Sequence, residues 1–171
     1  MHEQLCFLSA TQMAQGVRDK SVSAVELTGA VLDRIELLNP ELNAYCTLMA
    51  DSAREAAREA DDKLSRGEEP GPLHGVPLSI KDNLYVKDSR TTFGSKLQEH
   101  DITGEDAPLT ERLRDAGAII LGRTNSPEFG WKGVTDNLVF GITRNPWNLE
   151  LTPGGSSGGG SAAVAAGLGP I

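Results

Sequence analysis

The hydrophobic positions in the first half of the chain recur at helical spacing. Between residues 24 and 38 the apolar side chains are separated by three or four positions: Ala24, Leu27, Val31, Ile35 and Leu38. This spacing is the period of one face of an α-helix, and Ser21 or Ser23 is suited to cap it. Asn39-Pro40 is expected to end the helix. A shorter helix opens after Ser9 and is expected to stop near Gly16.

A third helix is predicted over residues 52–66. Its apolar face consists mostly of alanine and its other face is charged, which is typical of a surface helix, and Gly67 is a suitable C-terminal cap. The residues before it, 42–48, form either a strand or an extended connection.

The pattern changes from helical spacing to alternation at residue 74. Two sets of side chains point to opposite sides of the predicted strand: Val76, Leu78 and Ile80 on one, Ser79 and Lys81 on the other. A lysine at the end of a strand ordinarily extends into water.

A helix and a second strand follow. The helix, residues 106–116, has Asp106 as its predicted N-cap and Pro108 in its first turn, with Leu109 and Leu113 on its buried face. The apolar residues 118–121 predict a short buried strand. This alternation of helices and strands indicates an α/β fold, and residues 122–151 are expected to be mostly loop.

Composition excludes several classes of function. With 171 residues, of which 39% are hydrophobic, the chain is long enough for one domain with a core. A net charge of −8 argues against nucleic acid or an anionic membrane as the main partner. No apolar run has the length of a membrane span. Two cysteines without metal-ligand spacing, Cys6 and Cys46, predict a reduced, cytoplasmic protein, and three histidines leave little material for a metal site.

A loop rich in glycine and serine, residues 152–160, runs into a stretch of small apolar residues that predicts the start of a helix. Such a loop at a helix N-terminus commonly handles anions, oxyanions or nucleophiles. A flexible linker is the alternative, but linkers rarely lead directly into a helix.

Two known motifs fit this loop only in part. The frames centred on Ser156 and Ser157 match the Gly-x-Ser-x-Gly nucleophile elbow, but neither an acidic residue nor a histidine follows in the chain. Residues 154–161 match the phosphate loop except that Gly160 stands where its lysine is required.

Four segments together carry a family resemblance. They are HGVPLSIKDN at residues 74–83, LGRTNSPEFG at 121–130, NPW at 145–147 and PGGSSGG at 153–159. In this order they resemble the amidase signature family. The resemblance implies a mixed β-sheet flanked by helices and hydrolysis of carboxylic amides through an acyl-enzyme. It also implies a Ser-Ser-Lys triad that needs neither a metal nor a cofactor.

The resemblance assigns roles to three residues of this chain. Lys81 matches the catalytic lysine, Ser156 the bridging serine that follows a cis peptide bond, and Ser157 a supporting serine. We therefore expect the Lys81 amine and the Ser156 hydroxyl to be within hydrogen-bonding distance. A lysine acts as a base only when neutral, and partial burial favours that form.

The family's acylated serine lies in a Thr-Asp-x-Gly-Gly-Ser-type segment, which we expect beyond Ile171. Residues 1–171 are thus predicted to be the N-terminal part of a single amidase domain, cut before the nucleophile and inactive alone. An incomplete sheet would leave an unpaired edge through which copies associate.

The loop that matches the family's acyl pocket makes Phe129 and Gly130 candidates to contact a small amide substrate, although Phe129 is equally well explained as a structural aromatic. Residues 125–129 read NSPEF, where the amidotransferase A subunit usually has NMDEF. This favours a stand-alone amidase. A non-catalytic binding or scaffold protein and an A-type amidotransferase subunit remain as alternatives.

Overall fold

The computed structural model of the chain describes residues 2–171. Its α-helices are α1 (His2–Cys6), α2 (Ala10–Arg18), α3 (Ala24–Leu42), α4 (Ala50–Ser65), α5 (Pro108–Asp115) and α6 (Gly158–Ala165). Its strands are β1 (Tyr45–Leu48), β2 (Pro77–Lys81), β3 (Ile119–Thr124), β4 (Asp136–Asn137) and β5 (Gly141–Ile142). Two short 3-10 helices, η1 (Lys96–Gln98) and η2 (Glu128–Gly130), lie in the connections.

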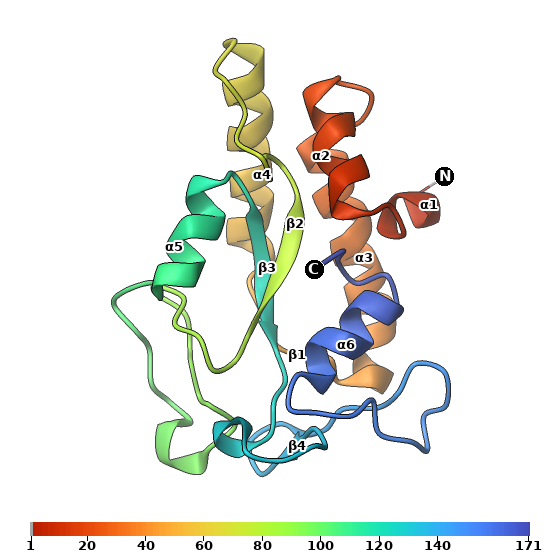
Figure 1. The fold of residues 1–171 in the computed structure, drawn as a ribbon, viewed down its shortest axis with the longest axis vertical. Helices are drawn as coiled ribbons and strands as arrows, with labels where there is room; N and C mark the ends of the chain where they lie inside the picture. Colours follow the sequence, from red (N-terminus) through yellow and green to blue (C-terminus); the bar gives the residue numbers. More distant parts are fainter. Residues whose placement is uncertain (1) are drawn as a thin grey trace.

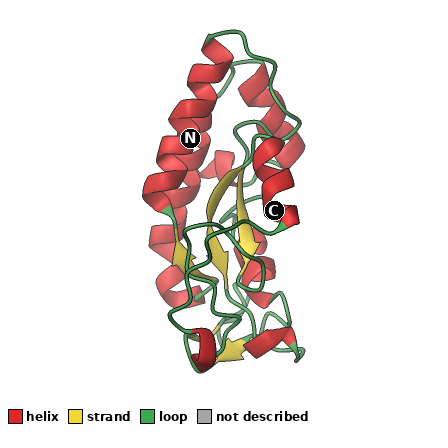
Figure 2. Ribbon diagram, turned by 90° about the vertical axis from the view of Figure 1, so that its left-hand side faces the viewer, coloured by secondary structure: helices red, strands yellow, loops and turns green. Residues whose placement is uncertain are grey.

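The central sheet is mixed, as predicted. Its strand order is β1-β3-β2, with β1 antiparallel and β2 parallel to β3. Figure 2 shows the strands between helices on either side, and Figure 1 shows α6 beside the sheet, next to α3. The fold is therefore α/β. The strand expected at 118–121 runs instead from Ile119 to Thr124, and its last three residues pair with both β1 and β2.

The two faces of β3 pack against different helices. Ile119 and Leu121 belong to the main core, with alanines of α4 and α6 and the apolar face of α3. Ile120 lies in a separate cluster with Leu78 and Ile80 of β2, and Leu113 of α5 packs against it. Ser79 and Lys81 are only partly buried. This arrangement leaves Lys81 free to reach the loop that precedes α6.

Val76 departs from the predicted alternation. It packs with Met13, Val17 and Leu27 rather than with Leu78 and Ile80. Strand β2 begins only at Pro77, and Val76 directly follows the turn at Gly75, whose φ is +76°.

The prediction that Asn39-Pro40 ends the long helix is wrong. Ser23 caps α3 through a capping box with Glu26, as expected of one of the two serines, but the helix continues through Pro40 to Leu42. The Asn39 amide donates to the Tyr45 carbonyl and accepts from its N–H. The chain then reverses at Asn43, whose φ is +50°. These tertiary bonds fix the end of the helix beyond the proline.

The end predicted for the first helix is also wrong. Helix α2, capped by Ser9, passes Gly16 and ends at Arg18. A glycine inside a helix costs about 1 kcal/mol relative to alanine, and the burial of Val17 outweighs it. Gly16 is required by its neighbour, because a Cβ there would lie 2.8 Å from Cγ1 of Val22.

Helix α5 begins later than predicted and buries a different residue. Its N-cap is Ala107, while the Asp106 carboxylate accepts from the Lys87 N–H and from Nε of Arg114. Leu109 is 48% exposed, and Thr110 occupies the buried position with its hydroxyl donating to the Tyr85 carbonyl. Leu113 packs on the core as expected.

Other elements follow the sequence closely. Helix α4 begins two residues before the predicted range of 52–66 and ends one residue short of it, and Gly67, just after its C-cap Arg66, has a φ of +78°. The segment 42–48, left open between strand and connection, contains β1. The expected loop at 122–151 includes the small antiparallel sheet of β4 and β5. Across the described residues, every helix is too short or too polar to span a bilayer.

Candidate active site

Strand β2 delivers Lys81 to the loop before α6. The Lys81 amine donates to the Ser156 hydroxyl at 2.8 Å and to the Ser157 hydroxyl at 3.1 Å. The predicted contact is confirmed, and the alternative of a lysine extended into bulk water is wrong. The three side chains that the sequence singled out thus lie together although 75 residues separate Lys81 from Ser156.

The serine loop turns sharply before it enters α6. The peptide bond between Gly155 and Ser156 is cis, as predicted. Gly154 has a φ of +87°, and α6 begins at Gly158. The next residue, Gly159, packs so closely on the neighbouring backbone that a Cβ would lie 2.5 Å from the Asn125 nitrogen and carbonyl oxygen. The glycines of this loop therefore serve close packing as well as turning.

Partial burial sets the electrostatics of the amine. Desolvation lowers the pKa of Lys81 below its ordinary value, since burial disfavours the charged form. In its neutral form, an amine beside two hydroxyls is able to accept a proton from one of them. The arrangement is thus suited to general base chemistry.

Sequence analysis missed a buried ion pair next to the backbone of Lys81. The Arg123 guanidinium is 3.4 Å from the Asp82 carboxylate, and both side chains are almost fully inaccessible. Arg123 also donates to the Lys81 carbonyl at 3.3 Å and to the Thr91 hydroxyl at 2.7 Å. The Asp82 carboxylate accepts from the Thr92 hydroxyl at 2.6 Å. These contacts fix the backbone that carries Lys81.

One signal in the sequence pointed to this pair. Arg123 follows four apolar or small residues inside a strand whose six positions are all buried. A charged residue in such a run needs a buried partner. Asp82, at the end of the adjacent parallel strand, supplies it.

Of the two residues expected to contact substrate, Gly130 lies beside the serine. Its φ is +69°, and a Cβ there would be 3.8 Å from both the Ser156 hydroxyl and the Asn83 amide nitrogen. Phe129 is 54% exposed, and its ring lies 6.1 Å from that of Phe93. Their substrate-binding role stays a prediction, and a Cβ at position 130 would be in ordinary van der Waals contact with Ser156.

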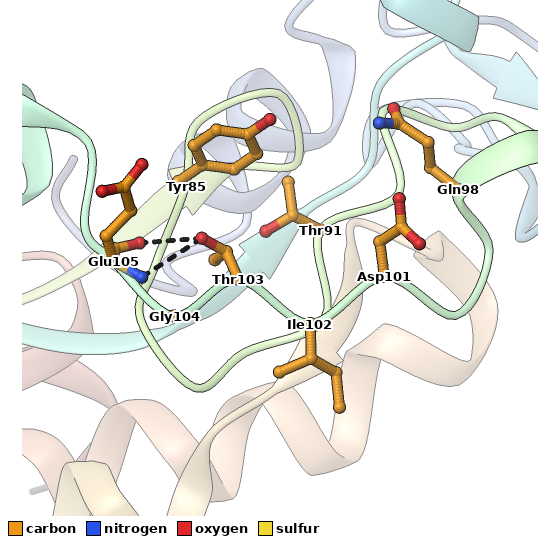
Figure 3. A pocket seen from close by; sticks show the side chains of 8 residues that line it. All are labelled: Tyr85, Thr91, Gln98, Asp101, Ile102, Thr103, Gly104 and Glu105. Atoms are coloured by element: carbon orange, nitrogen blue, oxygen red, sulfur yellow. Dashed lines mark hydrogen bonds between the residues drawn. The ribbon is translucent and has the colours of Figure 1, made fainter.

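A cavity of about 440 Å³ lies along the loop that follows β2 (Figure 3). Tyr85, Thr91, Gln98 and Asp101 line it together with residues 102–105. The ring of Tyr85 contacts Phe93 edge to face at 5.8 Å, and Phe93 in turn neighbours Phe129. The serines and Lys81 do not line this cavity. Within residues 2–171, no group of three His, Cys, Asp or Glu side chains is arranged to hold a metal ion.

Comparison with known proteins identifies the family of the chain. The family model described as Amidase matches residues 26–171. The chain is 48% identical over 164 residues to the A subunit of the glutamyl-tRNA(Gln) amidotransferase from Carboxydothermus hydrogenoformans, covering 96% of this chain and 34% of that protein. It is 45% identical over 169 residues to an acylamidase of Rhodococcus erythropolis, covering 99% and 35%.

The fold agrees with these relatives. A solved structure of fatty acid amide hydrolase superimposes with a TM-score of 0.94 at 32% identity, covering 99% of this chain and 30% of that one. The chain therefore belongs to the amidase signature family. It spans about a third of the length of the curated relatives that it matches.

Proposed function

We propose that residues 1–171 form the N-terminal part of an amidase domain and supply the base and the proton relay of a Ser-Ser-Lys triad. The hydrogen bond from Lys81 to Ser156 is the observation that carries this proposal. It joins the end of a parallel strand to a glycine-rich loop, and desolvation lowers the pKa of the amine involved. Ser157, which also accepts from Lys81, supports the same arrangement.

The proposed chemistry moves one proton through two side chains. Neutral Lys81 takes the proton of the Ser156 hydroxyl, and Ser156 takes the proton of the attacking serine, which the family places after this segment. That serine oxygen bonds to the amide carbon. As the C–N bond breaks, Ser156 gives its proton to the leaving nitrogen and takes one back from Lys81. Water then hydrolyses the acyl-enzyme by the same relay.

The substrate class follows from the surroundings of Ser156. Gly130 lies next to Ser156, and the neighbouring Phe129, which is exposed, offers an apolar contact for an acyl group. We therefore propose a small carboxylic amide as substrate, with no role for a nucleic acid or a membrane as partner. Where residues 1–171 occur alone, we expect copies to associate through the outer edge of β2. In the described structure, Ser79 on this edge donates its N–H and its hydroxyl to the Ile171 carbonyl.

An A-type amidotransferase subunit is the second candidate, because the first relative named above is such a protein. The sequence NSPEF at residues 125–129 argues for the stand-alone amidase. The two candidates differ in substrate. A stand-alone amidase hydrolyses simple aryl amides without a partner, whereas the amidotransferase component releases ammonia from an amide donor inside a complex.

The experiment compares residues 1–171 with the protein extended through the family's nucleophile segment. Both are assayed with an aryl amide and with glutamine. We expect the extended protein to hydrolyse the aryl amide with a burst of acyl-enzyme, and residues 1–171 to show no turnover above background. Enzyme-like turnover by residues 1–171 that Ser156→Ala abolishes would place the nucleophile at Ser156 instead. An extended protein inactive on both amides would contradict the stand-alone amidase and would fit either an A-type subunit that needs its complex or the non-catalytic alternative.

A further inference from the structure

A threonine outside the triad ties the two ends of the serine loop together. Thr135 is buried and immediately precedes β4. Its hydroxyl donates to the Gly154 carbonyl at 2.9 Å and accepts from the Gly158 N–H at 3.0 Å. Ser156 and Ser157 lie between these two glycines in the chain. One side chain thus fixes the residues that flank both serines.

The segment that carries Thr135 is pressed against the loop. A Cβ on Gly155 would lie 2.7 Å from the Val134 nitrogen, and a Cβ on Gly158 would lie 2.3 Å from the Thr135 hydroxyl. Contacts this short leave no space for a side chain at either glycine. Glycine at these two positions therefore lets the loop pack directly against Val134 and Thr135.

The small sheet holds Thr135 in place. The Thr143 N–H donates to the Thr135 carbonyl at 2.9 Å, and the next residue, Asp136, pairs with Ile142 across β4 and β5. The Asn137 amide donates to the Asn125 side chain and to the Ser126 carbonyl, at the end of β3. The sheet of β4 and β5 is thus attached to the strand that neighbours Lys81.

Packing alone does not fix the serines. Ser156 is half-buried and Ser157 is exposed, and a loop rich in glycine has more backbone freedom than one of other residues. We propose that Thr135 is a positioning residue, which sets the Ser156 and Ser157 hydroxyls against the Lys81 amine. This inference rests on the function proposed above. Displacing a catalytic group by about 1 Å can reduce the rate about 100-fold.

The test uses the extended, active protein and three variants. Thr135→Val removes the hydroxyl and keeps the shape, Thr135→Ser keeps the hydroxyl, and Thr110→Val makes the same change at a buried threonine of α5 whose hydroxyl bonds to Tyr85. We expect Thr135→Val to lower kcat by about 10- to 100-fold with KM changed less than about twofold, as for a group that acts in the transition state. Thr135→Ser and Thr110→Val are expected to keep kcat within about threefold.

A second readout separates this inference from the proposed function. The titration of the Lys81 amine, followed by NMR, is expected to shift in Thr135→Val and not in Thr110→Val, whether or not an amide is turned over. A wild-type protein that hydrolyses no amide would contradict the proposed function. The Lys81 titration would still test whether Thr135 positions the serines.

Two results would overturn the role of Thr135. One is a kcat and a Lys81 titration in Thr135→Val that equal those of Thr110→Val. The other is a loss in Thr135→Ser, which keeps the hydroxyl, as large as in Thr135→Val, which would show that the hydroxyl does not account for the effect. If Thr135→Val does not fold, Thr135→Ala removes the same hydroxyl without adding bulk and replaces it in both measurements.

Discussion

The amine of Lys81 and the hydroxyl of Ser156 are hydrogen-bonded at 2.8 Å, although one ends a strand and the other lies in a loop 75 residues later. Strand β2 directs Lys81 away from the cluster that buries Leu78 and Ile80. Helix α6, packed on the main core through Ala162 and Ala163, holds the loop from the other side. The fold thus brings together the two side chains that we propose as base and relay.

The activity of the extended protein is expected to depend on the protonation of Lys81. Burial lowers the pKa of its ammonium, and only the neutral amine accepts a proton. The rate should therefore rise with pH and level off below the ordinary lysine pKa of about 10.4. The measurement is a profile of kcat/KM against pH. A rise centred at or above the ordinary value would contradict a desolvated base.

The same shift links pH to stability. Between the lowered pKa of folded Lys81 and its ordinary value, the unfolded chain binds more protons than the folded one. The contribution of Lys81 to the free energy of unfolding should therefore increase with pH across that interval. Comparison of wild type with Lys81→Met in urea, over this pH range, isolates the contribution.

Arg123→Met is expected to destabilise the fold by about 3–5 kcal/mol, because it leaves the buried Asp82 carboxylate without its charged partner. The free energy of unfolding is measured by urea denaturation. Arg66→Met is the control, since Arg66 pairs with Glu68 on the surface and exposed pairs contribute about 1 kcal/mol or less. Equal losses in the two variants would show that the buried pair does not hold the end of β2.

Two adjacent glycines of α6 are expected to respond oppositely to alanine. A Cβ on Gly159 would lie 2.5 Å from backbone atoms of Asn125, whereas the nearest atom to one on Gly160 is the Thr124 hydroxyl at 3.7 Å. Gly159→Ala should therefore cost about 1–3 kcal/mol or more through overpacking. Gly160→Ala should be neutral or stabilise by up to about 1 kcal/mol, as alanine favours a helix. Similar thermal midpoints for the two variants would contradict this packing.

Periodicity predicted α3 and α4 well, because each of these helices buries one face. It failed where a tertiary contact decides the outcome. Helix α3 passes Pro40 because Asn39 bonds to Tyr45. Asp106 caps no helix because its carboxylate is bonded to Lys87 and Arg114.

The candidate site was predictable in part. Family resemblance, rather than spacing, selected Lys81 and Ser156, since a lysine at a strand end ordinarily extends into water. The supporting residues are different. Arg123 and Thr135 act through contacts with Asp82 and with the serine loop, which are distant in sequence. Only the packed structure shows which polar groups these side chains meet.

The most direct test of the base-and-relay account is a double-mutant cycle in the extended protein. Lys81→Met and Ser156→Ala are measured singly and together, with Lys96→Met as a surface control that removes an exposed ion pair with Glu99. Each single change at the site should lower kcat by about 10²–10⁴-fold. Because the two residues pass the same proton, the double variant should lose no more than the more impaired single variant. Losses that multiply in the double variant would show that Lys81 and Ser156 act independently, and would contradict the account.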